Sequence, residues 1–248
     1  MRLQPPIASK LAARPLAAKA AARRGFSRAI RGSVWRRWSK RHYVSPAVVH
    51  CIIPLAVLEA VRNLDTPVED GLSEFADELL SKRLGLSSTV AMQLAQYESL
   101  ARRGARVDAA LVEALLRLVG RRPDADLVFA DAGRRAARRA VRRLSLLSRA
   151  AASAAPRSLG YAVARRAARR VLGGELRRED HIPVARIDAP MAVRATPDGI
   201  ACGLYAAGFA ELLRLLAGYE GAMLHNVCRA TGGDRCEWRA AAADPRHQ

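Results

Sequence analysis

The spacing of apolar residues in this chain changes after residue 172, and this change limits the folds that are open to it. Before that point apolar residues recur mainly at helical spacing. After it, proline and β-branched residues appear and alternation replaces the helical period, with Ile182, Val184 and Ile187 marking a strand. The order helix, helix, strands, helix, hairpin predicts an α+β domain of helices packed on a small antiparallel sheet.

We expect three regions along the chain. Residues 1–43 carry 12 Lys and Arg residues and no acidic residue, which predicts a disordered or loosely helical basic leader that can lie on an anionic membrane surface. Residues 44–123 are expected to be all-helical, and residues 124–243 are expected to form the α+β domain.

The hydrophobic spacing also predicts individual elements. The helices expected in the second region are Pro46–Asn63, Asp70–Arg83, Ser88–Arg103 and Asp108–Gly120. The elements expected in the third region are helices Asp126–Leu147, Ser158–Leu172 and Ile200–Leu216, strands at Ile182–Ile187 and Ala192–Ala195, and a hairpin of Ala222–Arg229 with Arg235–Ala240.

The net charge of +19 reflects 42 basic residues, 38 Arg and 4 Lys, against 23 acidic ones, in a chain that also holds 50 Ala residues. Arginines recur in pairs every four residues along one predicted helix, at Arg134, Arg135, Arg138, Arg139, Arg142 and Arg143. A surface that reads nucleic acid needs aromatic or amide side chains aimed at the bases, and the arginine-rich helices offer none. We therefore expect solvated helix faces and no nucleic-acid partner.

No segment approaches the ~20 consecutive apolar residues that span a bilayer. Residues 1–43 also lack the apolar stretch that follows the basic start of a secretory signal. The expected location is the cytoplasm, peripheral to the inner membrane through the basic leader.

Three cysteines give the strongest chemical signal. Cys202 opens a predicted helix, whose N-terminus is expected to favour its thiolate form, and Cys228 and Cys236 flank the predicted hairpin turn. A three-residue turn with Gly233 in the left-handed conformation would pair Cys228 with Cys236, with their Cβ atoms about 5 Å apart on one face. Three thiolates can occupy three corners of a tetrahedral zinc site.

The fourth zinc ligand is left open by the sequence. Asp188 stands at a predicted strand end and is our assignment; His181, Asp198 and His225 are the alternatives. Two other interpretations of the cysteines are a cross-strand disulfide between Cys228 and Cys236, and small buried hydrophobic side chains.

The C-terminal half of the chain resembles the 4-vinyl reductase domain. The resemblance is carried by Gly199-Ile200-Ala201-Cys202, by Tyr205-Ala206-Ala207-Gly208-Phe209-Ala210-Glu211-Leu212-Leu213, and most specifically by Cys228-Arg229-Ala230-Thr231-Gly232-Gly233-Asp234-Arg235-Cys236-Glu237-Trp238. It covers roughly residues 124–240. The family includes bacteriochlorophyll 4-vinyl reductase-like proteins and the sensor domains of aromatic-responsive transcription activators.

The resemblance implies a domain that binds a hydrophobic, aromatic or tetrapyrrole molecule, with Zn²⁺ held by Cys202, Cys228 and Cys236. The zinc-containing sensors have a Glu shortly before the first of these cysteines, whereas residues 189–201 contain none. The family also usually has a Glu three residues before the second cysteine, where this chain has His225. The residues expected to line the ligand pocket are Phe129, Tyr205, Phe209, Leu213, Met223, His225 and Trp238.

The alternative function is a tetrapyrrole 4-vinyl (8-vinyl) reductase, or an accessory or carrier protein of bacteriochlorophyll synthesis. The sequence has no glycine-rich nucleotide-binding loop after a strand, so the reductase reading rests on family analogy alone. Besides the small molecule, the expected partners are a second copy of the chain or an effector protein.

Overall fold

Helices and two small antiparallel sheets make up residues 48–65, 88–145 and 157–241, which are the residues that a computed structural model describes. The elements of the first part are β1 (Val48–His50), α1 (Ile52–Asp65), α3 (Ser88–Arg103), β2 (Arg106–Asp108), α4 (Ala109–Val119) and α5 (Ala125–Arg142). Those of the second part are α7 (Arg157–Ala167), a π-helical turn (Ala168–Leu172), β3 (Glu175–Glu179), β4 (Ile182–Ile187), α8 (Met191–Ala195), a 3₁₀ turn (Ile200–Cys202), α9 (Gly203–Ala217), β5 (Met223–Val227), a 3₁₀ turn (Arg229–Thr231) and β6 (Cys236–Ala240). This mixed structure agrees with the predicted α+β class.

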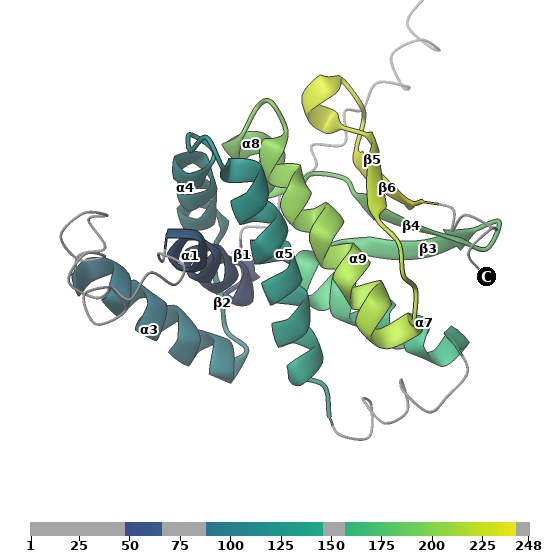
Figure 1. Ribbon diagram of the computed structural model, residues 1–248, viewed down its shortest axis with the longest axis horizontal. Helices are drawn as coiled ribbons and strands as arrows, with labels where there is room; N and C mark the ends of the chain where they lie inside the picture. The colour runs from purple at the N-terminus through teal and green to yellow at the C-terminus, as the bar shows by residue number, and fades with distance from the viewer. Residues whose placement is uncertain (1–47, 66–87, 146–156, 242–248) are drawn as a thin grey trace, which may run out of the picture. The chain divides into compact units, whose positions relative to one another are not determined.

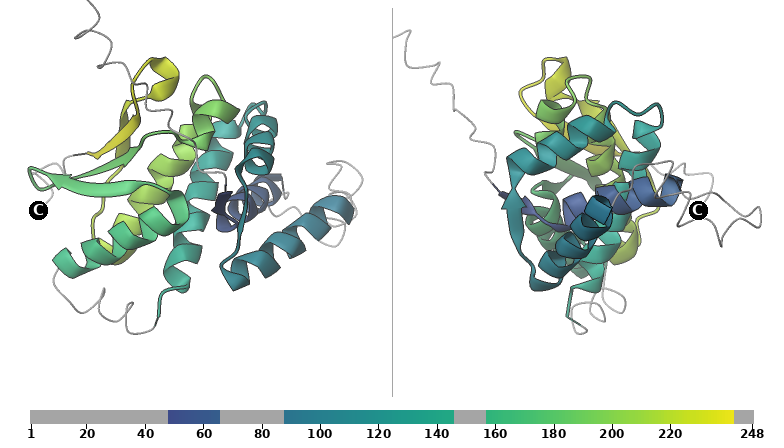
Figure 2. Two further views of the ribbon diagram at one scale, coloured as in Figure 1. Left: turned by 180° about the vertical axis from the view of Figure 1, so that it is seen from behind. Right: turned by 90° about the vertical axis from the view of Figure 1, so that its left-hand side faces the viewer.

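The larger sheet has four strands in the order β3-β4-β6-β5, all antiparallel, and the smaller sheet pairs β1 with β2 (Figure 1). One face of the larger sheet is covered by α9 and α7. Beyond them follow α5, then α1 with α4, and finally α3, as Figure 1 and the left view of Figure 2 show. Described residues on both sides of position 123 contribute to one hydrophobic core, so the helices of 48–119 and the later elements are packed together.

The most extensive contact between two helices of the described residues is that of α5 with α9, which lie side by side (Figure 1). A Cβ atom added at Gly133 of α5 would lie 2.2 Å from the carbonyl oxygen of Leu204 and 2.8 Å from the amide nitrogen of Gly208. The burial of the α5 alanines supports the same conclusion, since Ala132, Ala136 and Ala137 are fully buried. The arginine–alanine pattern therefore gives α5 one face of small residues, which lets its backbone contact the backbone of α9.

Three parts of the fold differ from the sequence predictions. The region expected to be all-helical contains β1 and β2, because the predicted helix from Pro46 begins only at Ile52, after a strand of two valines and a histidine. The predicted strand Ala192–Ala195 is the short helix α8, since Pro190 sets its start and the segment is rich in good helix formers. Strand β3 was missed because Leu176 is its only apolar residue. The predicted helix Asp70–Arg83 and the basic leader 1–43 lie outside the described residues.

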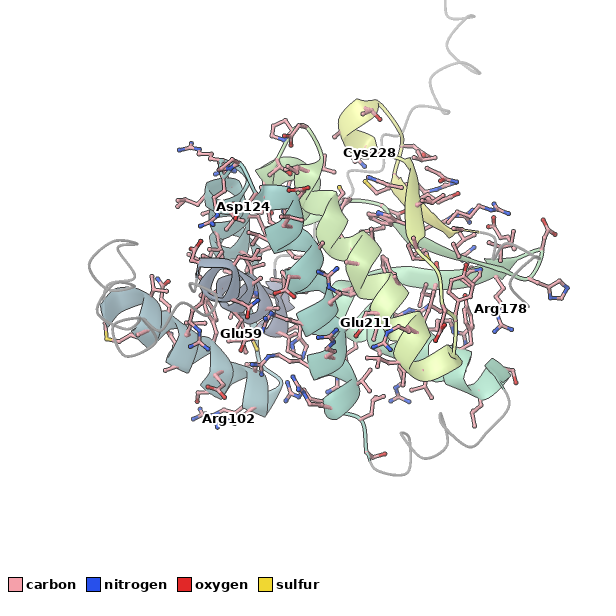
Figure 3. All side chains as sticks on the ribbon, in the orientation of Figure 1. Glu59, Arg102, Asp124, Arg178, Glu211 and Cys228 are labelled. Carbon is pink, nitrogen blue, oxygen red and sulfur yellow. The ribbon has the colours of Figure 1, made fainter. Side chains whose placement is uncertain are left out.

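Several arginines of the α5 stripe have acidic or carbonyl partners within the protein. Arg135 pairs with Asp131 at 2.6 Å, Arg138 pairs with Glu211 at 2.7 Å, and Arg139 pairs with Glu59 of α1. Figure 3 shows Glu59 and Glu211 on either side of α5. Glu211 is 5% exposed, and hydrogen bonds from Arg214 and Arg138 lower its pKa to about 2. Part of the charge thus ties α5 to its neighbours, where a solvated face was expected.

Among the described residues, the stretch Ile200–Ala217 is apolar and long enough to meet the criterion for a membrane span, which the sequence reading did not anticipate. It comprises α9 and the turn before it, and 61% of it is buried inside the protein. In this fold it is the central core helix.

The contact between α5 and α9 makes a testable prediction at Gly133. The Gly133→Ala substitution forces the Leu204 carbonyl or the α5 backbone to move, so we expect it to lower the free energy of unfolding by about 1–3 kcal/mol. Chemical denaturation followed by circular dichroism measures this change.

The matched control is Gly203→Ala, at a helical glycine of α9 whose added Cβ would meet only the Cβ of Phe129, at 4.0 Å. That variant should be neutral or up to ~1 kcal/mol more stable, because alanine favours the helix. Equal stability of the two variants would contradict the close-contact account.

Candidate metal centre

Four side chains that can bind a metal ion converge between the start of α9 and the β5–β6 hairpin. One ligand atom each of Cys202, His225, Cys228 and Cys236 lies within 4.8 Å of the other three. The sulfurs of Cys228 and Cys236 are 4.0 Å apart, close to the ~3.8 Å edge of a tetrahedron with Zn–S bonds of about 2.3 Å. A disulfide would require a separation of ~2.05 Å, and all four cysteines of the chain are free thiols. The four side chains are close enough together to hold a metal ion.

Cys202 is held by a turn that ends in the first residues of α9. Gly199 adopts φ +79°, and a Cβ atom there would lie 3.2 Å from the Cys228 sulfur. The buried hydroxyl of Thr196 donates to the Ala192 carbonyl at 2.9 Å and accepts from the Ala201 amide at 3.1 Å. The left-handed glycine and the buried threonine thus bring the Cys202 thiol to the hairpin.

A β-bulge allows His225 and Cys228 to face the same side. His225 lies opposite Trp238, but Val227 lies opposite Glu237, so Asn226 is an extra residue in β5. In a regular strand, residues three apart point to opposite faces; one inserted residue returns them to the same face. The bulge therefore turns both side chains toward the face that also carries Cys236 and Trp238, which are buried.

The loop between Cys228 and Cys236 is folded by hydrogen bonds to its two ends. The carbonyl of Cys228 accepts from the amides of Thr231 at 3.2 Å and Gly233 at 2.9 Å. The amide of Arg229 donates to the Cys236 sulfur at 3.3 Å. The prediction that the two cysteines share a face agrees with their short distance, but the left-handed residue is Gly232, at φ +95°, and not Gly233.

The four side chains differ in their electrostatic surroundings. Hydrogen bonds lower the pKa of Cys236 to about 5, first the one from the Cys202 thiol and then that from the Arg229 amide. The pKa of Cys202 is raised by that same hydrogen bond and by burial. The lowered pKa thus belongs to Cys236, and no lowering of the Cys202 pKa by the helix N-terminus is seen. A metal ion bound here would have to displace the Cys202 proton.

The structure brings His225 into the group and leaves Asp188 out. The backbone carbonyl of Asp188 accepts a hydrogen bond from the Arg229 guanidinium at 2.9 Å, and its carboxylate is not among the clustered ligand atoms. Asp198 caps the turn before Cys202, with its carboxylate accepting from the Ile200 amide. His181 lies in the turn between β3 and β4. The sequence alone could not choose among these, because the bulge at Asn226 decides the direction of His225.

The residues expected to line a ligand pocket form a packed group beside this centre. Phe129, Phe209, Leu213 and Trp238 are fully buried, and Tyr205 and Met223 are nearly so. The rings of Tyr205 and Phe209 each lie 5.6 Å from the Trp238 ring. His225 stacks on Trp238 at 4.8 Å with an interplanar angle of 12°. Trp238 thus joins the metal-ligand group to the aromatic core.

Comparison with known proteins gives no match of any kind: no family model matches the chain, and neither does any curated protein or any solved structure. The resemblance to the 4-vinyl reductase domain therefore stays a prediction that rests on the motif residues.

The identity of the fourth ligand can be tested by comparing two single variants. We expect His225→Ala to weaken zinc binding by at least about 100-fold, since loss of an outer-shell partner alone costs 10–100-fold. Competition with a chromophoric chelator measures the affinity.

Asp188→Ala is the matched control, because the side chain of Asp188 is exposed and was the ligand expected from the sequence. It should bind zinc as tightly as the unchanged protein. If Asp188→Ala weakens binding and His225→Ala does not, the assignment of His225 is wrong.

Proposed function

We propose that this protein is a zinc-stabilised domain that binds a small hydrophobic, aromatic or tetrapyrrole molecule. The observation that carries the zinc assignment is the convergence of three thiols and an imidazole within 4.8 Å, from two segments that are distant in the chain. Three cysteines and one histidine form a complete tetrahedral ligand set, which is typical of structural zinc. The bound ion would fasten the hairpin to the start of α9.

Two observations support a ligand near the aromatic core. The indole Nε1–H of Trp238 is buried and lacks a hydrogen-bond partner among the described residues. A buried donor without an acceptor costs about 1–3 kcal/mol, so an acceptor group on a bound molecule would be favoured there. The motif that resembles the 4-vinyl reductase domain includes Trp238 and Tyr205, which meet in this core.

The zinc assignment predicts about one zinc ion per chain in the purified protein. Cys202→Ala should lose the ion and unfold at a lower temperature, because a structural metal contributes directly to folding. Cys51→Ala is the control: Cys51 is also a buried free thiol but is not part of the ligand group. Metal analysis and thermal denaturation check both variants.

Zinc well below one per chain, with all thiols reduced, would contradict the assignment. So would equal loss of zinc from the Cys51→Ala and Cys202→Ala proteins.

The ligand assignment is tested by incubating the protein with porphyrins, naphthalene, ethylbenzene and acetophenone. We expect at least one of them to raise the unfolding temperature. Trp238→Phe replaces the indole with a smaller aromatic ring that has no N–H. It should therefore weaken the binding of acetophenone, which has a carbonyl acceptor, about tenfold more than that of ethylbenzene, which has none. No stabilisation by any member of the panel would overturn this part of the proposal.

A further inference from the structure

A second chemical feature lies away from the metal ligands, in a cavity of about 150 Å³ between β1, the end of α5 and the π-helical turn. Its polar lining is His50, Arg143 and Arg170. Its apolar lining is Ala140, Leu144, Ala167 and Val171. None of the four candidate metal ligands borders it, so a molecule bound in this cavity would be independent of the proposed zinc ion.

The polar side of this cavity is strongly cationic. The charged groups that act on His50 are Arg143, Arg106 and Arg170, and all of them are arginines. One guanidinium is already held in place: Arg143 donates from Nη2 to the Arg102 carbonyl at 2.8 Å. Arg143 and Arg170 both line the cavity, and a guanidinium matches a carboxylate in a bidentate geometry.

His50 adds a neutral donor. Its Nδ1 accepts a hydrogen bond from the Ile52 amide at 3.2 Å, so in the neutral ring the proton is on Nε2. Burial and the nearby arginines lower the pKa of His50 to about 4, which keeps the ring neutral at pH 7. An imidazole in this state donates one hydrogen bond from Nε2 and adds no charge.

The backbone beside the cavity is itself unusual. Arg170 and Val171 belong to the π-helical turn Ala168–Leu172, which ends at Gly173 with φ +71°. Such turns are rare and are found frequently at functional sites. The π-helical turn is a property of the backbone and is separate from the charges of the side chains, and two of its residues line the cavity.

We propose that this cavity binds a small monocarboxylic acid with a compact apolar body, of about the size of benzoate. An apolar cavity of about 150 Å³ in another protein holds benzene, which sets the size of the apolar part. The ring would lie against Ala140, Ala167 and Val171, and the carboxylate would meet Arg143, Arg170 and His50. The apolar wall disfavours a bare inorganic anion.

The test uses benzoate as the probe and isothermal titration of the full chain, with the zinc content of each preparation measured. We expect benzoate to bind with a Kd of roughly 0.1–1 mM. Benzamide, the neutral analogue of the same shape, and inorganic phosphate, which lacks the ring, should each bind at least about tenfold more weakly.

Two charge-matched variants locate the site. Arg170→Gln should weaken benzoate binding about tenfold. Arg165→Gln, at an exposed arginine of α7 outside the cavity lining, should leave binding unchanged.

Failure of benzoate to bind, equal affinity for phosphate or benzamide, or equal effects of the two substitutions would each overturn the proposal. Zinc-replete protein that does not bind benzoate would refute the cavity site alone. Zinc-free protein that binds benzoate would refute the metal centre alone.

Discussion

The backbone contact between α5 and α9 is the constraint on which the rest of the structure depends. At Gly133 there is no room for a Cβ atom between the helix and the Leu204 carbonyl, so the two helices are fixed at close range. A second close approach joins α7 to α9 at Gly160, where a Cβ atom would lie 1.8 Å from the Leu216 carbonyl. Small residues lose little side-chain entropy and allow extensive dispersion contact, which makes up for the small area that alanine buries.

This helix pair determines where the chemistry can lie. Cys202 precedes α9 directly, so the position of its thiol follows from the packing of α9 on α5. The hairpin and the loop at its end supply the other three candidate metal ligands, and Trp238 anchors the hairpin by packing against Tyr205 and Phe209 of α9. Ion pairs also stabilise this helix pair. Arg138 of α5 and Arg214 of α9 both bond to the nearly buried Glu211, so part of the large positive charge of the chain holds α9 in place.

The sequence predicted the helices well and the strands less well, for physical reasons. A helix such as α5 repeats its apolar face every turn, so its pattern is visible without knowledge of its neighbours. Strands β1 and β3 are short, and their pairing partners are what stabilise them; nothing local in Glu175–Glu179 separates a strand from a charged loop. The same limit applies to the metal site. The cysteine spacing was visible, but the choice of His225 depends on one bulged residue, Asn226, which the alternation pattern does not reveal.

The two proposed sites lie at different levels along α5, and only the proposed metal site also borders α9. The metal ligands lie near the start of α9, beside Gly133, whereas Arg143 follows the end of α5 ten residues later, about 15 Å along the helix axis. They share no side chain, so their binding energies should add unless a ligand shifts α5 against α9. The backbone contact at Gly133 resists such a shift, because it leaves no room for a Cβ atom between α5 and the Leu204 carbonyl. The fold therefore favours two sites that act independently, and coupling between them would require the helix contact to open.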